Sequence, residues 1–126
     1  MNMDLTIDTN GFYYPGKRNF REIRPEQVKT AEAYIKSHFW RIKTINRRCG
    51  SYRLKDWAEK WGALMNKDFN TNIFEPYISN GAFIQASKNL GYTIVPQYSM
   101  SPNAYFNMGM PSMLTMIREY ERLGVM

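Results

Sequence analysis

The side chains that most often carry catalysis or bind metals are scarce in this sequence. His38 is its only histidine and Cys49 its only cysteine. Zinc sites use three or four protein ligands, so one histidine and one cysteine without clustered carboxylates are too few. Arg47 and Arg48 could lower the pKa of the Cys49 thiol, but no second histidine is present to act as its base. We expect a packed or half-exposed histidine and a partly buried thiol.

Other signatures of enzymes are also missing from the sequence. Asp56 and Glu59 stand three residues apart and are flanked by Lys55 and Lys60, which favours ion pairing on a helix surface over acid–base catalysis. No Walker loop or other glycine-rich phosphate-binding motif follows a strand. The sequence therefore predicts a protein that is not an enzyme, uses no cofactor or metal, and works by binding.

Charge is distributed unevenly along the 126 residues. Of the 17 lysines and arginines, 13 lie between Lys17 and Lys60, where five acids leave a net charge of +8. The segment from Asn89 to Ile117 has no charged residue at all. The excess of positive charge in residues 17–60 suggests a partner that carries phosphate, whether nucleic acid or a membrane surface. The alternative is a solvated face that keeps the protein in solution.

Length and composition predict one folded domain over residues 1–126. Hydrophobic residues make up 44% of the chain, including 9 Tyr, 7 Phe and 3 Trp, which argues against disorder. No apolar run approaches the roughly 18 residues that span a bilayer, and residues 1–10 lack the features of a signal peptide. A single cysteine fits a reducing compartment. We expect a cytoplasmic protein with no membrane partner.

The longest predicted element is a helix over residues 25–48. Pro25 suits the first helical position, and Gly50 suits the end of the helix after Arg47 and Arg48, whose charges complement the helix dipole. Apolar residues recur at helical spacing and predict one buried face. This face consists of Val28, Ala31, Ile35, Phe39, Ile42 and Ile45.

Shorter elements are predicted on both sides of this helix. Residues 1–24 are expected to form an extended arm, in which 5–7 and 12–14 could pair as a hairpin. Helices are predicted over 52–64 and 80–90, strands that pair antiparallel over 92–95 and 104–108, and a last helix from Ser112 to Gly124. The expected fold class is α+β, mostly α. The expected core contains Ile35, Phe39, Ile42, Leu54, Trp57, Phe83, Ile84 and Leu90.

Three helices followed by a two-stranded hairpin resemble the winged helix-turn-helix module, most closely those of phage and plasmid replication proteins. The resemblance covers residues 51–108 and depends on an aromatic second helix with Trp57, a third helix capped by Ser79 with Phe83, then Gly91 and the hairpin. It implies a winged-helix-like unit over 25–108, a C-terminal helix within 109–126, and DNA rather than RNA as the ligand. The blocks 51–55, 77–84 and 103–107 also resemble small phage or mobile-element proteins, which implies the host-cell cytoplasm.

Two binding functions stay open at this point. In the nucleic-acid interpretation, cations hold phosphates while the third helix presents amide side chains to the groove. DNA-reading winged helices usually carry arginine or lysine on both the third helix and the hairpin. Here the predicted third helix carries one cation and the hairpin none. The predicted site residues are Lys43, Arg47, Arg48, Arg53, Lys55, Asn80, Gln85 and Lys88.

In the protein-interaction interpretation, the charge-free segment 89–117, which we call the neutral half, is the functional surface of a phage-type inhibitor or an assembly protein. Its tyrosines, methionines, serines and asparagines are typical of recognition surfaces. A homodimer also stays open. The candidate contact residues are Tyr92, Tyr98, Ser99, Met100, Ser101, Asn103, Asn107, Met108 and Met110.

Overall fold

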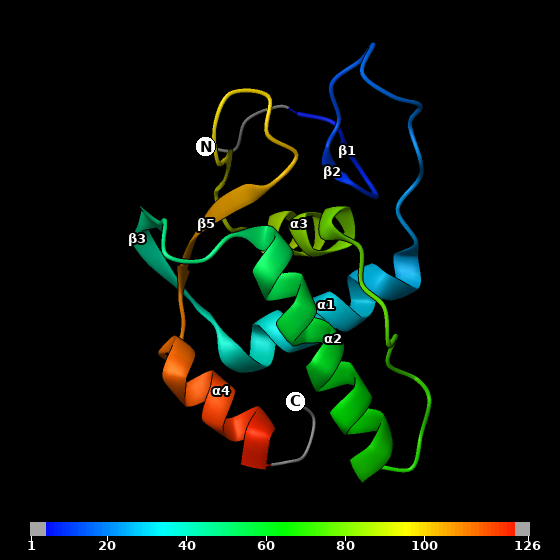
Figure 1. Cartoon of the computed structure of the whole chain (residues 1–126), viewed down its shortest axis with the longest axis vertical. Helices are drawn as coiled ribbons and strands as arrows, with labels where there is room; N and C mark the ends of the chain where they lie inside the picture. The colour runs from blue at the N-terminus through cyan, green and yellow to red at the C-terminus, as the bar shows by residue number, and fades with distance from the viewer. Residues whose placement is uncertain (1–4, 123–126) are drawn as a thin grey trace.

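The chain alternates helices with short strands, and the computed structural model describes residues 5–122 (Figure 1). The fold class is α+β, as predicted. The helices are α1 (Pro25–His38), α2 (Ser51–Asp68), α3 (Asn80–Asn89) and α4 (Met113–Arg122). The strands are β1 (Ile7–Asp8), β2 (Gly11–Phe12), β3 (Trp40–Asn46), β4 (Ile94–Pro96) and β5 (Ala104–Gly109).

The strands form two small antiparallel sheets. β1 and β2 make a short hairpin near the N-terminus, within the segment where the sequence left a hairpin open. The larger sheet has the order β3-β5-β4. The predicted pairing of the last two strands is confirmed, since Ile94 lies opposite Phe106 and Val95 opposite Tyr105.

The prediction of one helix over residues 25–48 is wrong beyond His38. α1 ends there, and Trp40–Asn46 forms strand β3 along the edge of β5. Ile42 and Ile45 fit helical spacing, but Thr44 and the aromatic residue Trp40 also favour a strand, and pairing with β5 decides the outcome. Gly50 consequently stands at the N-cap of α2 rather than at the end of α1.

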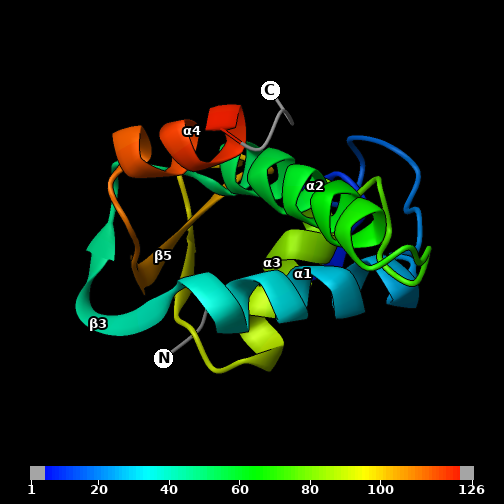
Figure 2. The same ribbon diagram turned by 90° about the horizontal axis from the view of Figure 1, so that it is seen from below.

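Helix α3 packs against both α1 and α2 and also contacts strands of both sheets (Figure 2). Its residues Phe83 and Ile84 are fully buried. Of the predicted core, six residues are buried, whereas Ile42 and Leu90 are half-buried because Ile42 belongs to β3 and Leu90 is the C-cap of α3. The six are Ile35, Phe39, Leu54, Trp57, Phe83 and Ile84.

Helix α4 packs against α1 and α2 through two buried side chains, Met116 and Tyr120. Its Tyr120 ring lies 5.0 Å from the Trp57 ring, centroid to centroid, and Met116 is buried beside Tyr34. Ser112 caps the helix by accepting the backbone N–H of Thr115, which confirms its predicted start. The predicted end at Gly124 lies outside the described residues. Among residues 5–122, no helix has the length and apolar character needed to cross a membrane.

Candidate nucleic-acid interface

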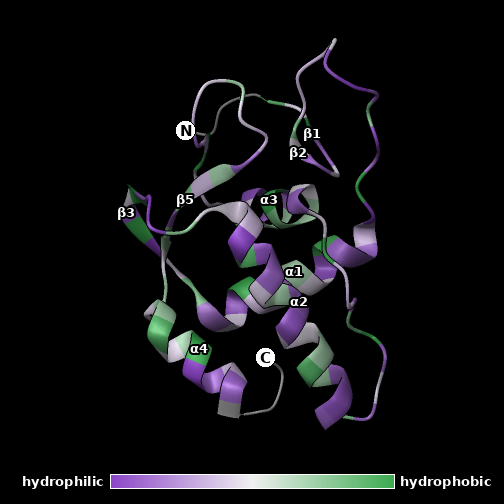
Figure 3. Cartoon of the chain, in the orientation of Figure 1, coloured by the Kyte–Doolittle hydropathy of each residue, from purple (hydrophilic) through white to green (hydrophobic). Residues whose placement is uncertain are grey.

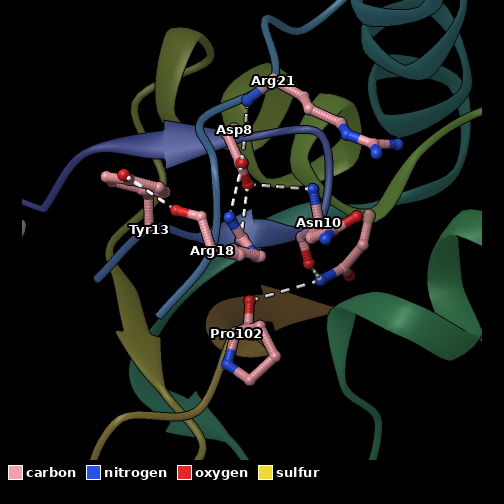
Figure 4. A network of polar contacts seen from close by, with 7 residues as sticks. Asp8, Asn10, Tyr13, Arg18, Arg21 and Pro102 are labelled. Atoms are coloured by element: carbon pink, nitrogen blue, oxygen red, sulfur yellow. Dashed lines mark hydrogen bonds and ion pairs between the residues drawn. The ribbon is translucent and has the colours of Figure 1, made fainter. Parts of the chain in front are cut away.

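The N-terminal segment, which contains β1 and β2, packs directly against the start of α3. The fully buried carboxylate of Asp8 accepts two hydrogen bonds from the Arg18 guanidinium, at 2.6 and 2.7 Å, and the backbone N–H groups of Asn10 and Arg21 (Figure 4). A Cβ atom at Gly81 would collide with the Asp8 carbonyl oxygen. The hairpin β1–β2 therefore covers the first turn of the helix that the sequence assigned to the DNA groove.

Asn80 illustrates the consequence for the predicted groove contacts. It is only 5% exposed, and its Nδ2 donates to the carbonyl oxygens of Asn10 and Pro102 and to Oδ1 of Asn103. The prediction that Asn80 faces a nucleic-acid groove is therefore wrong, because its amide joins three segments of the protein. The small residue at Gly81 was the one sequence signal of this close approach.

The remaining outer face of α3 has acidic neighbours. Gln85 and Lys88 are half-buried, and Gln85 Nε2 donates to Asn89, whose Nδ2 in turn donates to Glu32 at 2.9 Å. Gln85 also lines a cavity of about 560 Å³ together with Glu22 and Glu32. Carboxylates at this position repel phosphate, so α3 is poorly suited to enter a groove.

Lys55 is not part of the exposed basic surface. Its Nζ lies 3.2 Å from Asp56 and 3.5 Å from Glu59, and its side chain is only 8% exposed. The ammonium also lies between the rings of Tyr52 and Tyr77, 4.9 and 5.2 Å from their centroids. Burial lowers the pKa of Lys55, but Glu59 and Asp56 outweigh it, so the net shift is upward. The prediction of a phosphate contact is wrong for this residue because its charge is already neutralised.

The other four predicted cations are exposed around β3 and the start of α2. We call Lys43, Arg47, Arg48 and Arg53 the β3–α2 basic surface. None of them forms an ion pair with another residue of the described range 5–122. The sequence has no acid between Glu32 and Asp56, so this stretch contributes only positive charge. Arg47 and Arg48 also line one hollow with Ile42 and residues 44–46.

Aromatic residues that the sequence analysis did not select lie beside this surface. The Arg47 guanidinium carbon lies 5.6 Å from the centroid of the Tyr105 ring on β5. Trp40 is 53% exposed on β3, where hydrophobic and hydrophilic residues stand side by side (Figure 3). Trp40 was missed because the helix prediction placed it on a helix; its position in a run of aromatic and β-branched residues was the available signal.

The histidine and the cysteine occupy packed positions. The His38 ring stacks on Tyr34 with centroids 4.4 Å apart, and its Nδ1 lies 2.6 Å from Ser37 Oγ. Cys49 is buried, and burial raises the pKa of its thiol while Arg53 partly opposes that shift. Within residues 5–122 no three His, Cys, Asp or Glu side chains gather as metal ligands would.

The neutral half offers a smaller surface than its composition suggested. Tyr92 and Met108 are buried in the core, and Asn107 and Ser101 are also buried. The exposed residues are at the tip of the β4–β5 connection: Tyr98, Ser99 and Met100.

The candidate interface is thus defined by its own geometry, as the β3–α2 basic surface with the aromatic residues beside it. The chain has no significant match among protein-family models, curated proteins or solved structures.

Proposed function

We propose that this protein is a small non-catalytic nucleic-acid-binding protein of the cytoplasm, which contacts phosphates through the β3–α2 basic surface. The observation that carries the proposal is that all four cations of this surface are exposed and form no ion pair within residues 5–122. An exposed cation that has no carboxylate partner can neutralise a phosphate and release its condensed counterion. The cations Arg18 and Lys55, by contrast, are engaged with carboxylates.

We further propose a winged-helix-like assignment, of phage or mobile-element origin. The order of α1, α2 and α3 followed by the β4–β5 hairpin supports it, since the resemblance depends on that order. β3 adds a third strand to the hairpin at the edge of β5. The burial of α3 argues against groove reading by this helix, so the contacts we propose are to phosphates and carry little sequence specificity.

The test is a titration of labelled single-stranded and duplex oligonucleotides at 50 to 200 mM salt. The logarithm of the affinity falls with the logarithm of the salt concentration by about 0.7 per phosphate contact on single strands and 0.9 on duplexes. We expect the double variant Arg47→Ala/Arg48→Ala to reduce the slope by about 1.4 to 1.8 units.

The matched control is Lys29→Ala/Lys67→Ala. It removes the same charge from two exposed positions, one on α1 and one in the last turn of α2. We expect it to leave the slope nearly unchanged. Equal effects of the two double variants would mean that only net charge matters, and absence of binding at 50 mM salt would refute the proposal.

A protein partner is the second candidate function. The exposed tip of the β4–β5 connection favours it, because Tyr98 is 65% and Met100 51% exposed and Met100 adopts a positive φ of 65°. Large apolar side chains held outward are typical anchors of protein interfaces. A protein that binds no nucleic acid but loses a partner on Tyr98→Ala would favour this function.

A further inference from the structure

We propose that the ligand is single-stranded nucleic acid, whose bases stack on the outer face of the β3-β5-β4 sheet while its phosphates contact the β3–α2 basic surface. This inference deepens the proposed function and depends on it. It comes from the arrangement of two aromatic side chains on that face, Trp40 and Tyr105.

The alternation along β5 defines the outer face. Ala104, Phe106 and Met108 are at most 1% exposed and point into the core. Because successive side chains of a strand point to opposite faces, Tyr105 and Gly109 belong to the outer face. The inner row is therefore occupied by core packing. In the outer row Asn107 is also buried, so a ligand could reach this face at Tyr105 and at the exposed Trp40 that is paired with Gly109.

Trp40 lies flat on this outer face. It is paired with Gly109, and a Cβ atom at Gly109 would collide with the indole Nε1. The close approach therefore requires glycine, and it supports one face of the indole with the backbone of β5. With 53% of the residue exposed, the indole still offers a large surface to solvent. A fixed, exposed aromatic ring is the kind of platform on which unpaired bases stack.

Arg47 and Tyr105 form a second stacking position. Arg47 follows Asn46 and Tyr105 precedes Phe106, and Asn46 and Phe106 are paired across antiparallel strands, so Arg47 and Tyr105 are neighbours on the same face. The guanidinium lies over the tyrosine ring at 5.6 Å. Arginine guanidinium planes stack on bases as aromatic side chains do, so Arg47 can contact a base as well as a phosphate.

The two positions are too far apart to serve one base. Tyr105 and Gly109 are four residues apart, which is about 14 Å along an extended strand. Asn107 lies between them, and its Oδ1 accepts the backbone N–H of Thr93 at 2.7 Å, which fixes it to the strand edge. The face can thus accept two separate bases from one strand that passes over it.

Both positions require bases that are not already stacked. In a duplex the faces of the bases are hidden inside the stack, so neither Trp40 nor the Arg47–Tyr105 pair could reach them without unpairing, which costs free energy. Groove entry by α3, the other route to a duplex, is opposed by its burial and by Glu32. Geometry and charge together favour the single strand.

The experiment uses oligo(dT), oligo(U) and a duplex of equal length at 50 mM salt, followed by tryptophan fluorescence and by anisotropy of a labelled strand. Trp57 is 6% exposed and Trp61 half-buried, so Trp40 is the tryptophan that a ligand can quench most. We expect both single strands to quench it and to bind at least tenfold more tightly than the duplex. If oligo(dT) and oligo(U) differ, the face also recognises the 2′-hydroxyl of the sugar or the thymine methyl group.

Variants then test the stacking itself. Trp40→Ala is expected to weaken single-strand binding about 5- to 150-fold, the range for the loss of one stacked base. Trp40→Phe should keep most of the affinity while removing the quenching, and Trp61→Phe should change neither. Arg47→Lys keeps the positive charge but removes the planar guanidinium that can stack on a base. It should therefore lower single-strand affinity and leave the salt slope unchanged. Circular dichroism checks that each variant is folded.

The possible results separate this inference from the proposed function. Duplex binding as tight as single-strand binding, or full affinity in both Trp40→Ala and Arg47→Lys, overturns the stacking proposal while nucleic-acid binding stands. No binding of any oligonucleotide at 50 mM salt overturns both. If Trp40→Ala does not fold, the fluorescence of the unmodified protein and the Arg47→Lys variant still decide the question.

Discussion

The Trp40 indole rests directly on the backbone of Gly109, across the strand pair β3–β5. No other residue fits at position 109 without moving the indole, because a Cβ atom would overlap its pyrrole ring. We expect Gly109→Ala to destabilise the protein by about 1–3 kcal/mol, as overpacked substitutions do. Denaturant unfolding measures this loss.

A second substitution at Trp40 is the control for this predicted collision between the Gly109→Ala methyl group and the indole. In a Trp40→Ala background the ring is absent, so Gly109→Ala should cost clearly less than in the unmodified protein. The coupling between neighbouring sites of this kind is typically 0.5–3 kcal/mol. Additive effects of the two substitutions would show that Trp40 does not lie on Gly109 in solution.

Lys55→Met tests whether the buried lysine belongs to the binding surface. Its charge is engaged by Glu59 and Asp56, so we expect no change in the salt dependence of nucleic-acid binding. The free energy of unfolding should fall by about 1–3 kcal/mol, because Glu59 loses its cation. Arg53→Met, two residues earlier and exposed, should do the opposite: reduce the salt slope by 0.7 to 0.9 and leave stability within about 0.5 kcal/mol.

Asp8→Asn tests the ion pair that holds the N-terminal segment, residues 8–21, in the shape that covers the start of α3. The carboxylate is fully buried and accepts four hydrogen bonds, two of them from Arg18. Losing one partner of a buried ion pair is strongly destabilising, and because Arg18 retains 28% exposure we expect about 2–4 kcal/mol. Glu26→Gln removes the exposed ion pair with Arg24 and should not change the unfolding midpoint measurably.

Tyr120 predicts a loss of stability in alkali. Burial raises its pKa to about 12 from the usual value near 10, and burial also raises the pKa of Tyr34. The native state therefore holds these protons more tightly than the unfolded chain, so stability is complete below pH 10 and falls as the pH rises above it. For Tyr120 the loss by pH 12 is about 2–3 kcal/mol.

Urea unfolding at pH 9 and pH 11 measures this dependence. Tyr120→Phe should reduce the difference between the two pH values, and the contribution of Tyr34 should remain. Tyr98→Phe, at an exposed position, serves as the control and should leave the difference intact. An unmodified protein equally stable at both pH values would contradict the prediction.

Local signals predicted the parts of the fold that local sequence controls. Pro25, the Ser79 cap and the change of pattern at Gly91 marked the starts of α1 and α3 and the approach to β4. β3 was not predictable in the same way. Its isoleucines fit both helical and extended spacing, and its partner β5 lies about sixty residues further along the chain.

In the candidate site, too, some residues could be predicted from local sequence and others could not. The cations of the β3–α2 basic surface were predictable, because an acid-free run in a polar stretch is exposed in most arrangements. Asn80 and Lys55 were not, since their burial depends on distant residues, Pro102 for the first and Tyr77 for the second. Residue type alone does not distinguish a contact to a ligand from a contact to the protein.

The pairing of β3 with β5 is interrupted between Arg41 and Asn46, and β3 forms one edge of its sheet. A regular strand in that place would be a template on which a second copy could add its own strand and begin an aggregate. The interruption bends the edge out of register, and Lys43 stands within it as a charged gatekeeper. The cations proposed to attract a polyanion would thus also keep copies of this protein apart, and neutralising them would bring a risk of self-association as well as a loss of affinity.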